Sequence, residues 1–240
     1  MIEQTPHFTD IDAVLFDLDG TLIEHTWQLS QITDSLFERY SDQLSPLTCD
    51  QFYEVFWPKN TDLWYMMVDG VIDGDTAQLY SYLNTLRALE KDTSLAAGMC
   101  ETWIELVLAE AIPFEDATTV LETVRSRYVT GIVTNGFTSM QRAKLNHYGL
   151  NQQVDFSLVS EEAGAHKPDP RIFAQALTQA GNIAPERALF IGDTLSSDIE
   201  GAQQAGLHAV FMNFRDDQTP PTGIVKIKKL SELLPLLALD

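Results

Sequence analysis

Short apolar runs that end in polar residues are the feature that most limits how this chain can fold. Residues 13–18 are apolar except for Asp17 and lead directly into Asp19-Gly20-Thr21, the pattern of a buried strand that ends in a turn. Amphipathic helical patterns separate these runs, and strands that alternate with helices predict a parallel sheet with helices on both faces. Similar apolar runs occupy residues 128–134, 156–160, 188–192 and 209–213, and the clearest helical stripe follows Pro170.

The stretch from residue 24 to residue 113 carries helical patterns without a strand pattern. These patterns cover residues 27–44, 76–90 and 96–111, and the stretch contains all four tryptophans of the chain. We therefore predict an α/β protein with a Rossmann-like, doubly wound core over residues 1–23 and 114–240. An all-helical subdomain over residues 24–113 is inserted into that core. Most of its aromatic residues should form the subdomain's own core; Trp64 and Tyr65 are the expected exceptions.

Composition narrows the classes of partner. The chain has 240 residues and a formal net charge of −20, which argues against binding to nucleic acid polymers or to anionic membranes, because both require a lysine- and arginine-rich surface. No basic leader precedes an apolar segment, and no apolar run is long enough to span a membrane, so we expect a cytoplasmic protein. The two cysteines, Cys49 and Cys100, are too few for a disulfide scaffold, so we expect their thiols to be buried or to have no chemical role.

Polar residues follow four of the predicted elements. In open α/β sheets, ligands bind at the carboxyl ends of the strands, so these residues should gather at one edge. If the strand geometry continued to residue 19, the carboxylates of Asp17 and Asp19 would lie about 6–7 Å apart on one face of the sheet. Two carboxylates that close repel each other, so they require a nearby cation or a shifted pKa. The set comprises Asp17, Asp19, Thr134, Asn135, Lys167, Asp193 and Asp198.

These residues together offer four carboxylates, one ammonium group and one hydroxyl. Oxygen ligands in small number suit Mg²⁺, which keeps water and substrate in its coordination shell. A magnesium ion, a lysine and backbone amides form a phosphate-binding set. The sequence has no G-x-x-x-x-G-K-[ST], G-x-G-x-x-G, H-E-x-x-H or G-x-S-x-G motif. The absence of these motifs argues against a P-loop nucleotide-binding protein, a dinucleotide-binding enzyme, a zinc protease and a serine hydrolase.

The order of these motifs resembles the haloacid dehalogenase superfamily of phosphotransferases over essentially the whole chain. The resemblance rests on Asp17-Leu18-Asp19-Gly20-Thr21, then Thr134, then Lys167, then Gly192-Asp193 with Asp198. Residues 133–139, 159–162 and 192–194 further resemble the bacterial pyrimidine-type 5′-nucleotidases of that superfamily.

The resemblance implies a role for each site residue. Asp17 would be the nucleophile that forms an aspartyl-phosphate, and Asp19 would be the general acid and then the general base. The phosphoryl oxygens would bind to Thr134, Asn135 and Lys167. The magnesium ligands would be Asp17, the main-chain carbonyl of Asp19, and Asp193, with Asp198 contributing directly or through water.

The expected function is a magnesium-dependent phosphomonoesterase that acts on nucleoside 5′-monophosphates, pyrimidine or non-standard ones. The helical insertion would be the mobile cap of the superfamily. A phosphatase of another small metabolite, such as a sugar phosphate, remains an alternative. A receiver-like module that keeps a phosphoaspartate is a second alternative, although Asp19 disfavours it because its carboxylate could activate water. The partner is thus a small phosphorylated metabolite, and the protein would be a monomer or a homodimer.

Overall fold

The chain divides into two compact units in a computed structural model that describes residues 8–24 and 28–239. Within the described residues, the first unit combines residues 8–24 with Pro113–Asn135 and residues 145–239. The second unit combines residues 28–112 with Gly136–Lys144. This short second segment follows the core strand that ends at Thr134, so the chain enters the helical unit a second time there.

Six parallel strands form the sheet of the first unit, in the order β3-β2-β1-β4-β5-β6. This is the Rossmann strand order, which reverses direction beside β1, and it confirms the predicted doubly wound core. Five of the strands match predicted apolar runs, and the short edge strand β6 was not predicted. The strands are β1 (Ala13–Phe16), β2 (Val129–Thr134), β3 (Phe156–Val159), β4 (Ala188–Gly192), β5 (His208–Met212) and β6 (Val225–Ile227).

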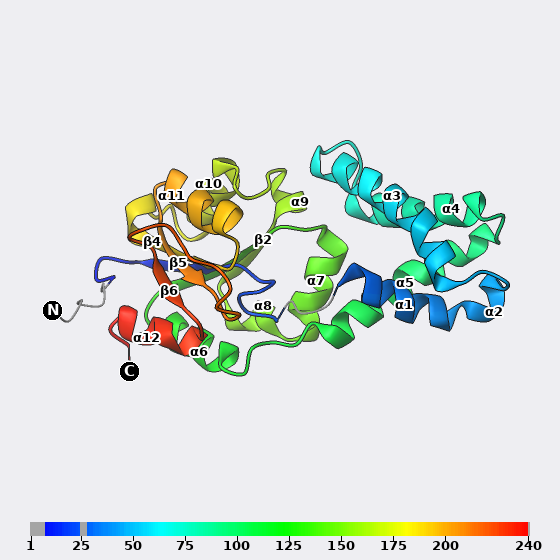
Figure 1. The fold of residues 1–240 in the computed structure, drawn as a ribbon. Helices are drawn as coiled ribbons and strands as arrows, with labels where there is room; N and C mark the ends of the chain where they lie inside the picture. Colours follow the sequence, from blue (N-terminus) through cyan, green and yellow to red (C-terminus); the bar gives the residue numbers. More distant parts are fainter. Residues whose placement is uncertain (1–7, 25–27, 240) are drawn as a thin grey trace. The chain divides into compact units, whose positions relative to one another are not determined.

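Helices cover both faces of this sheet, as expected for buried parallel strands. In Figure 1, α10 and α11 lie over one face and α6 and α12 over the other. The apolar stripe of α10, which includes Ile172 and Phe173, packs on Leu15 and Phe190 of the sheet. The helical elements of this unit are α6 (Ala117–Arg125), α8 (Leu150–Gln153), α9 (Ser160–Ala163), α10 (Pro170–Gln179), η2 (Pro185–Arg187), η3 (Leu195–Glu200), α11 (Gly201–Gln204), η4 (Leu230–Glu232) and α12 (Leu233–Leu236).

Among the described residues of the second unit, the regular secondary structure consists of helices. Its core contains a run of stacked rings in which Phe56 lies 5.9 Å from Phe52 and 5.2 Å from Tyr82, measured between ring centroids. The predicted helix start at Trp27 lies outside the described residues. The helical elements are α1 (Leu29–Arg39), α2 (Ser41–Leu44), α3 (Cys49–Val68), α4 (Gly74–Ala88), η1 (Thr93–Leu95), α5 (Ala96–Glu110) and the start of α7 (Thr138–His147).

The longest helix of this unit, α3, was not predicted from the sequence. Pro58 lies inside it, and an internal proline normally breaks or kinks a helix because it removes a hydrogen bond. The helix nevertheless continues, because Phe52, Phe56 and Met67 are buried along it and α4 packs against it. Among the described residues, no helix has both the length and the apolar character that crossing a membrane requires.

Both cysteines are free thiols that we expect to be inert in the folded protein. Burial and the carboxylate of Asp34, which accepts a hydrogen bond from the Cys49 thiol at 2.9 Å, raise the pKa of Cys49 to about 12. Burial and the charge of Asp75 raise the pKa of Cys100 to about 12. Because only the thiolate is nucleophilic, the native protein should react with iodoacetamide at pH 8 far more slowly than the same chain unfolded in urea. Rapid modification of one thiol in the native state would contradict this prediction.

Candidate active site

The site lies where the strand order of the sheet reverses. Asp17 follows β1, Thr134 is the last residue of β2, and Asp193 follows β4. Because β1 pairs with both β2 and β4, Thr134 and Asp193 lie on opposite sides of Asp17. The sheet therefore brings together residues that are more than 100 positions apart in the chain, at the edge where open α/β sheets bind their ligands.

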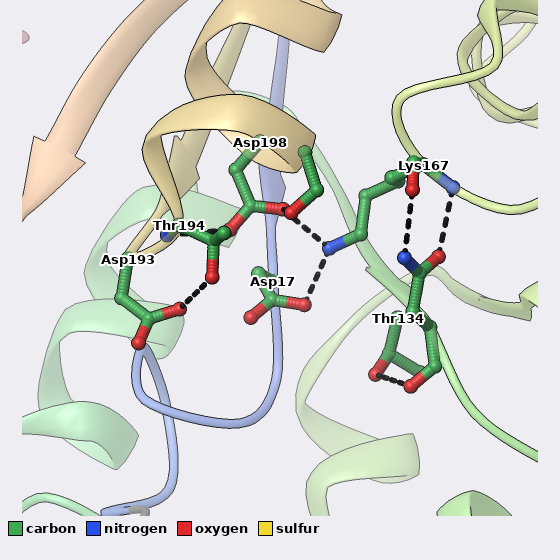
Figure 2. Close-up of polar contacts among 8 residues, drawn as sticks. Asp17, Thr134, Lys167, Asp193, Thr194 and Asp198 are labelled. Carbon is green, nitrogen blue, oxygen red and sulfur yellow. Dashed lines mark hydrogen bonds and ion pairs between the residues drawn. The ribbon is translucent and has the colours of Figure 1, made fainter. Parts of the chain in front are cut away.

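Lys167 forms the centre of a buried cluster of charges. Figure 2 shows its ammonium nitrogen paired with the carboxylates of Asp17 and Asp198. The nitrogen lies 2.5 Å from an oxygen of Asp17 and 2.8 Å from one of Asp198. It also lies 5.2 Å from the ring centroid of Phe190, within the range of a cation–π contact. The three charged side chains are between 2% and 8% exposed, so these ion pairs are largely shielded from water.

The electrostatics of the cluster follow from burial and crowding. Burial raises the pKa of Asp17 well above its ordinary value; the charges of Asp198 and Asp193 raise it further, while Lys167 opposes the rise. Burial and the charge of Asp198 raise the pKa of Asp193 to about 6. Burial disfavours the charge of Lys167, but the two carboxylates that it contacts outweigh this effect and raise its pKa.

Asp198 is held at both of its carboxylate oxygens. One oxygen contacts Lys167 and accepts a hydrogen bond from the Ser197 hydroxyl at 3.3 Å. The other accepts a hydrogen bond from the main-chain N–H of Thr194 at 3.0 Å. The roles of Ser197 and of the Thr194 N–H were not predicted, because a main-chain donor leaves no signature in the sequence. These bonds fix Asp198 within the wide helical turn η3.

Two glycines make room for the acidic residues. Gly20 has a φ of +85°, and a Cβ placed there would lie 2.0 Å from a carboxylate oxygen of Asp193. A Cβ at Gly192 would lie 2.4 Å from the Cβ of Asp198. Side chains at either position would therefore displace an acidic residue of the site.

The donor set fits a hard divalent cation. One carboxylate oxygen from each of Asp17, Asp193 and Asp198 lies within 4.8 Å of the others, and oxygen-only sets of this kind suit Mg²⁺. Because the folded-state pKa of Asp193 is raised from 3.8 to about 6, ionisation of this residue lowers the stability of the fold as the pH rises through that interval. A bound cation would offset that cost.

Three further predicted residues lie at the same strand ends. Asp19 is partly exposed in the turn after β1, where it forms a bridge with Ile23. The strand ends at Phe16 instead of residue 18, so strand geometry does not set the spacing between Asp19 and Asp17. Thr134 is buried at the end of β2. The side chain of Asn135, the next residue, contacts the main chain of Lys167.

Comparisons with known proteins agree with this architecture. The haloacid dehalogenase-like hydrolase family matches residues 11–206. The chain is 31% identical to the pyrimidine 5′-nucleotidase YjjG of Escherichia coli (strain K12), over 93% of this chain and 97% of the relative. It is 30% identical to the glyceraldehyde 3-phosphate phosphatase of Methanothermobacter thermautotrophicus, over 85% of this chain and 86% of the relative. The magnesium-bound crystal structure of the HAD-hydrolase YfnB from Bacillus subtilis superimposes with a TM-score of 0.67 and 26% identity, covering 96% of this chain and 100% of that one.

Replacing Gly20 with alanine should disturb the candidate metal site specifically. The added Cβ would push Asp193 aside, so we expect the affinity for Mg²⁺, measured by titration calorimetry, to fall by about 10-fold to 100-fold. The matched control is Gly181→Ala, because Gly181 also has a positive φ, +102°, but has no atom within 4 Å of the added Cβ. Both variants should lose about 1–2 kcal/mol of stability to the strained backbone. Equal Mg²⁺ affinities in the two variants would contradict the prediction.

Proposed function

Since the chain belongs to the haloacid dehalogenase-like hydrolase family, we propose that it is a magnesium-dependent phosphomonoesterase that forms an aspartyl-phosphate and prefers nucleoside 5′-monophosphates. The observation that carries the phosphatase chemistry is the buried Asp17, paired with Lys167 and adjoining two further carboxylates. In this proposal a nucleophile, a cation for the phosphoryl group and a set of metal ligands act together at one edge of the sheet. The preference for nucleotides rests on the similarity to a pyrimidine 5′-nucleotidase over 97% of that protein's length.

In the first step, Asp17 is the nucleophile. A carboxylate oxygen of Asp17 forms a bond to phosphorus while the bond from phosphorus to the ester oxygen breaks. The departing alkoxide takes a proton from Asp19 and leaves as an alcohol. The contact of Lys167 with Asp17 favours the ionised carboxylate, and the same ammonium group offsets negative charge on the phosphoryl oxygens.

In the second step, water attacks the phosphorus of the aspartyl-phosphate. Asp19 accepts a proton from that water, the bond between phosphorus and the Asp17 oxygen breaks, and inorganic phosphate leaves. Thr134, Lys167 and the main-chain N–H of Asn135 are the proposed donors to the phosphoryl oxygens in both steps. Asp19 thus returns to its protonated state and Asp17 to its carboxylate, which completes the cycle.

Asp17, the main-chain carbonyl of Asp19, and Asp193 would hold the magnesium ion, with Asp198 supporting it. When bound, the ion offsets the charge that the carboxylates and the phosphoryl group share. Asp198 also orients Lys167, because one of its oxygens contacts that ammonium group while the main chain holds the other.

The composition of the inserted segment, residues 24–113, supports a nucleoside over a second phosphate group. Trp64 and Tyr65 on α3 are 46% and 63% exposed, and exposed rings of this kind can stack on a nucleobase. The insertion has four basic residues, Arg39, Lys59, Arg87 and Lys91, against fifteen acidic ones over residues 24–113. It therefore has few cations with which to bind a triphosphate or a bisphosphate.

A phosphatase of small sugar phosphates is the second candidate function. The similarity to a glyceraldehyde 3-phosphate phosphatase, at 30% identity over 86% of that protein, favours it. Both candidates use the same core residues, so the choice between them depends on the substrate.

Phosphate release with Mg²⁺ should be measured for nucleoside 5′-monophosphates, sugar phosphates and a small aryl phosphate. We expect pyrimidine monophosphates to give the highest kcat/KM. Asp17→Asn should release no phosphate above background, because its amide is not a nucleophile. Higher kcat/KM for sugar phosphates would instead support the second candidate, and no release from any compound would contradict the phosphatase assignment.

Asp19→Asn should slow breakdown of the phosphorylated enzyme, because an amide cannot accept the proton of the attacking water. We expect kcat to fall by about 100-fold or more. Rapid acid quenching and intact-mass measurement with the aryl phosphate, a good leaving group, should show an added phosphoryl group in this variant. A long-lived phosphoaspartate already present in the unaltered protein would favour a signalling module instead.

A further inference from the structure

We propose that Asn135 is a positioning residue whose side chain fixes the main chain of Lys167, and through it the ammonium group of that lysine. This inference rests on the proposed function, because the benefit of placing Lys167 is realised on a phosphoryl group. The main-chain N–H of Asn135 keeps its proposed role as a phosphate donor, and the side chain takes this second role.

The side chain of Asn135 makes two hydrogen bonds to one residue across 32 positions of the chain. Its amide oxygen accepts a hydrogen bond from the main-chain N–H of Lys167 at 2.8 Å. Its amide nitrogen donates a hydrogen bond to the main-chain carbonyl of Lys167 at 2.9 Å. The pair is visible at the right of Figure 2. Because both ends of the amide are used, the side chain fixes the position and the orientation of the Lys167 backbone together.

Lys167 is consequently held at both of its ends. Asp17 and Asp198 bind its ammonium group, and Asn135 binds its main chain. A lysine side chain has four rotatable bonds and a large rotamer entropy, so ion pairs alone would leave the loop that carries it free to shift. With the backbone fixed, the same ion pairs define one position for the charge, which is what electrostatic stabilisation of a transition state requires.

The position of Asn135 in the chain gives this contact a second consequence. Asn135 is the last residue of its segment in the first compact unit, and Gly136 begins the segment that belongs to the helical unit. Phe137 packs there on Trp103, with ring centroids 5.9 Å apart. The two hydrogen bonds to Lys167 therefore hold the residue after Thr134 to the core, one position before the chain leaves it.

The test compares Asn135→Ala, Lys167→Met and the double variant by single-turnover phosphate release from the aryl phosphate with Mg²⁺. The matched control is Asn213→Ala, because Asn213 is also buried in the first unit and its amide donates to a main-chain carbonyl, that of Gln218, at 2.7 Å. A structural role alone would lower the thermal stability of both asparagine variants. Hydrogen exchange at the Lys167 amide adds a readout that is independent of activity.

If Asn135 acts through Lys167, Asn135→Ala should lose about 10-fold to 100-fold in rate. The double variant should then lie within about 3-fold of Lys167→Met, because residues that act as a unit are not additive. The Lys167 amide should exchange faster in Asn135→Ala but not in Asn213→Ala. Should Asn135→Ala fail to fold, Asn135→Asp carries the rate comparison without the exchange readout, because it keeps the acceptor for the Lys167 N–H and loses only the donor to the Lys167 carbonyl.

Other results would overturn the proposal. Equal rates for Asn135→Ala and Asn213→Ala would show that Asn135 does not act through Lys167. Losses that multiply in the double variant would show the same. An unaltered protein without phosphatase activity would refute the proposed function instead. In that case the exchange measurement still decides the positioning role, since unchanged protection of the Lys167 amide in Asn135→Ala would exclude it.

Discussion

The buried contact of Lys167 with Asp17 and Asp198 is the interaction on which the rest of the site depends. Moving a charged group out of water costs several kcal/mol of free energy per ion. The attraction between the two charges of a well-formed buried pair is about large enough to offset that cost. The cluster recovers this cost only because its geometry is close, with contacts of 2.5 and 2.8 Å. With Asp193 nearby, the carboxylates still exceed the single ammonium group in charge, and the site is therefore suited to a cation and a phosphoryl group that arrive together.

The fold maintains this geometry mainly through hydrogen bonds that involve main-chain groups of the site. Asp17 donates its main-chain N–H to Ile191 at 2.8 Å, which ties the backbone of this proposed nucleophile to the neighbouring strand β4. The Thr194 N–H holds one oxygen of Asp198, and Asn135 holds the backbone of Lys167. Beneath these residues, Leu15 and Phe190 belong to one apolar cluster with α10. The charged groups thus rest on a packed layer that resists movement.

The sequence predicted the strands of the core and the residues at their ends, because a strand buried on both faces is a nearly continuous apolar run. It did not predict α3, because the sequence shows Pro58, which normally destabilises a helix. The packing of Phe52 and Phe56 that outweighs this effect can be seen only in the structure. The strand β6 has only three residues, too few to show a period. The contact between Asn135 and Lys167 was also missed, because it joins a side chain to a main chain 32 positions away.

Two carboxylates in one turn can take different roles because their surroundings differ. Asp17 is 6% exposed, and its contact with Lys167 favours the ionised carboxylate against the opposing effect of burial, so the proposed nucleophile is dry and held in a fixed position. Asp19 is partly exposed beyond the end of β1, where its carboxyl group can exchange a proton with a leaving group and with water. Attack on phosphorus expels an alkoxide that needs that proton, whereas attack on a carbon–halogen bond expels an ion that does not. The presence of Asp19 therefore favours phosphoryl transfer over dehalogenation at this edge of the sheet.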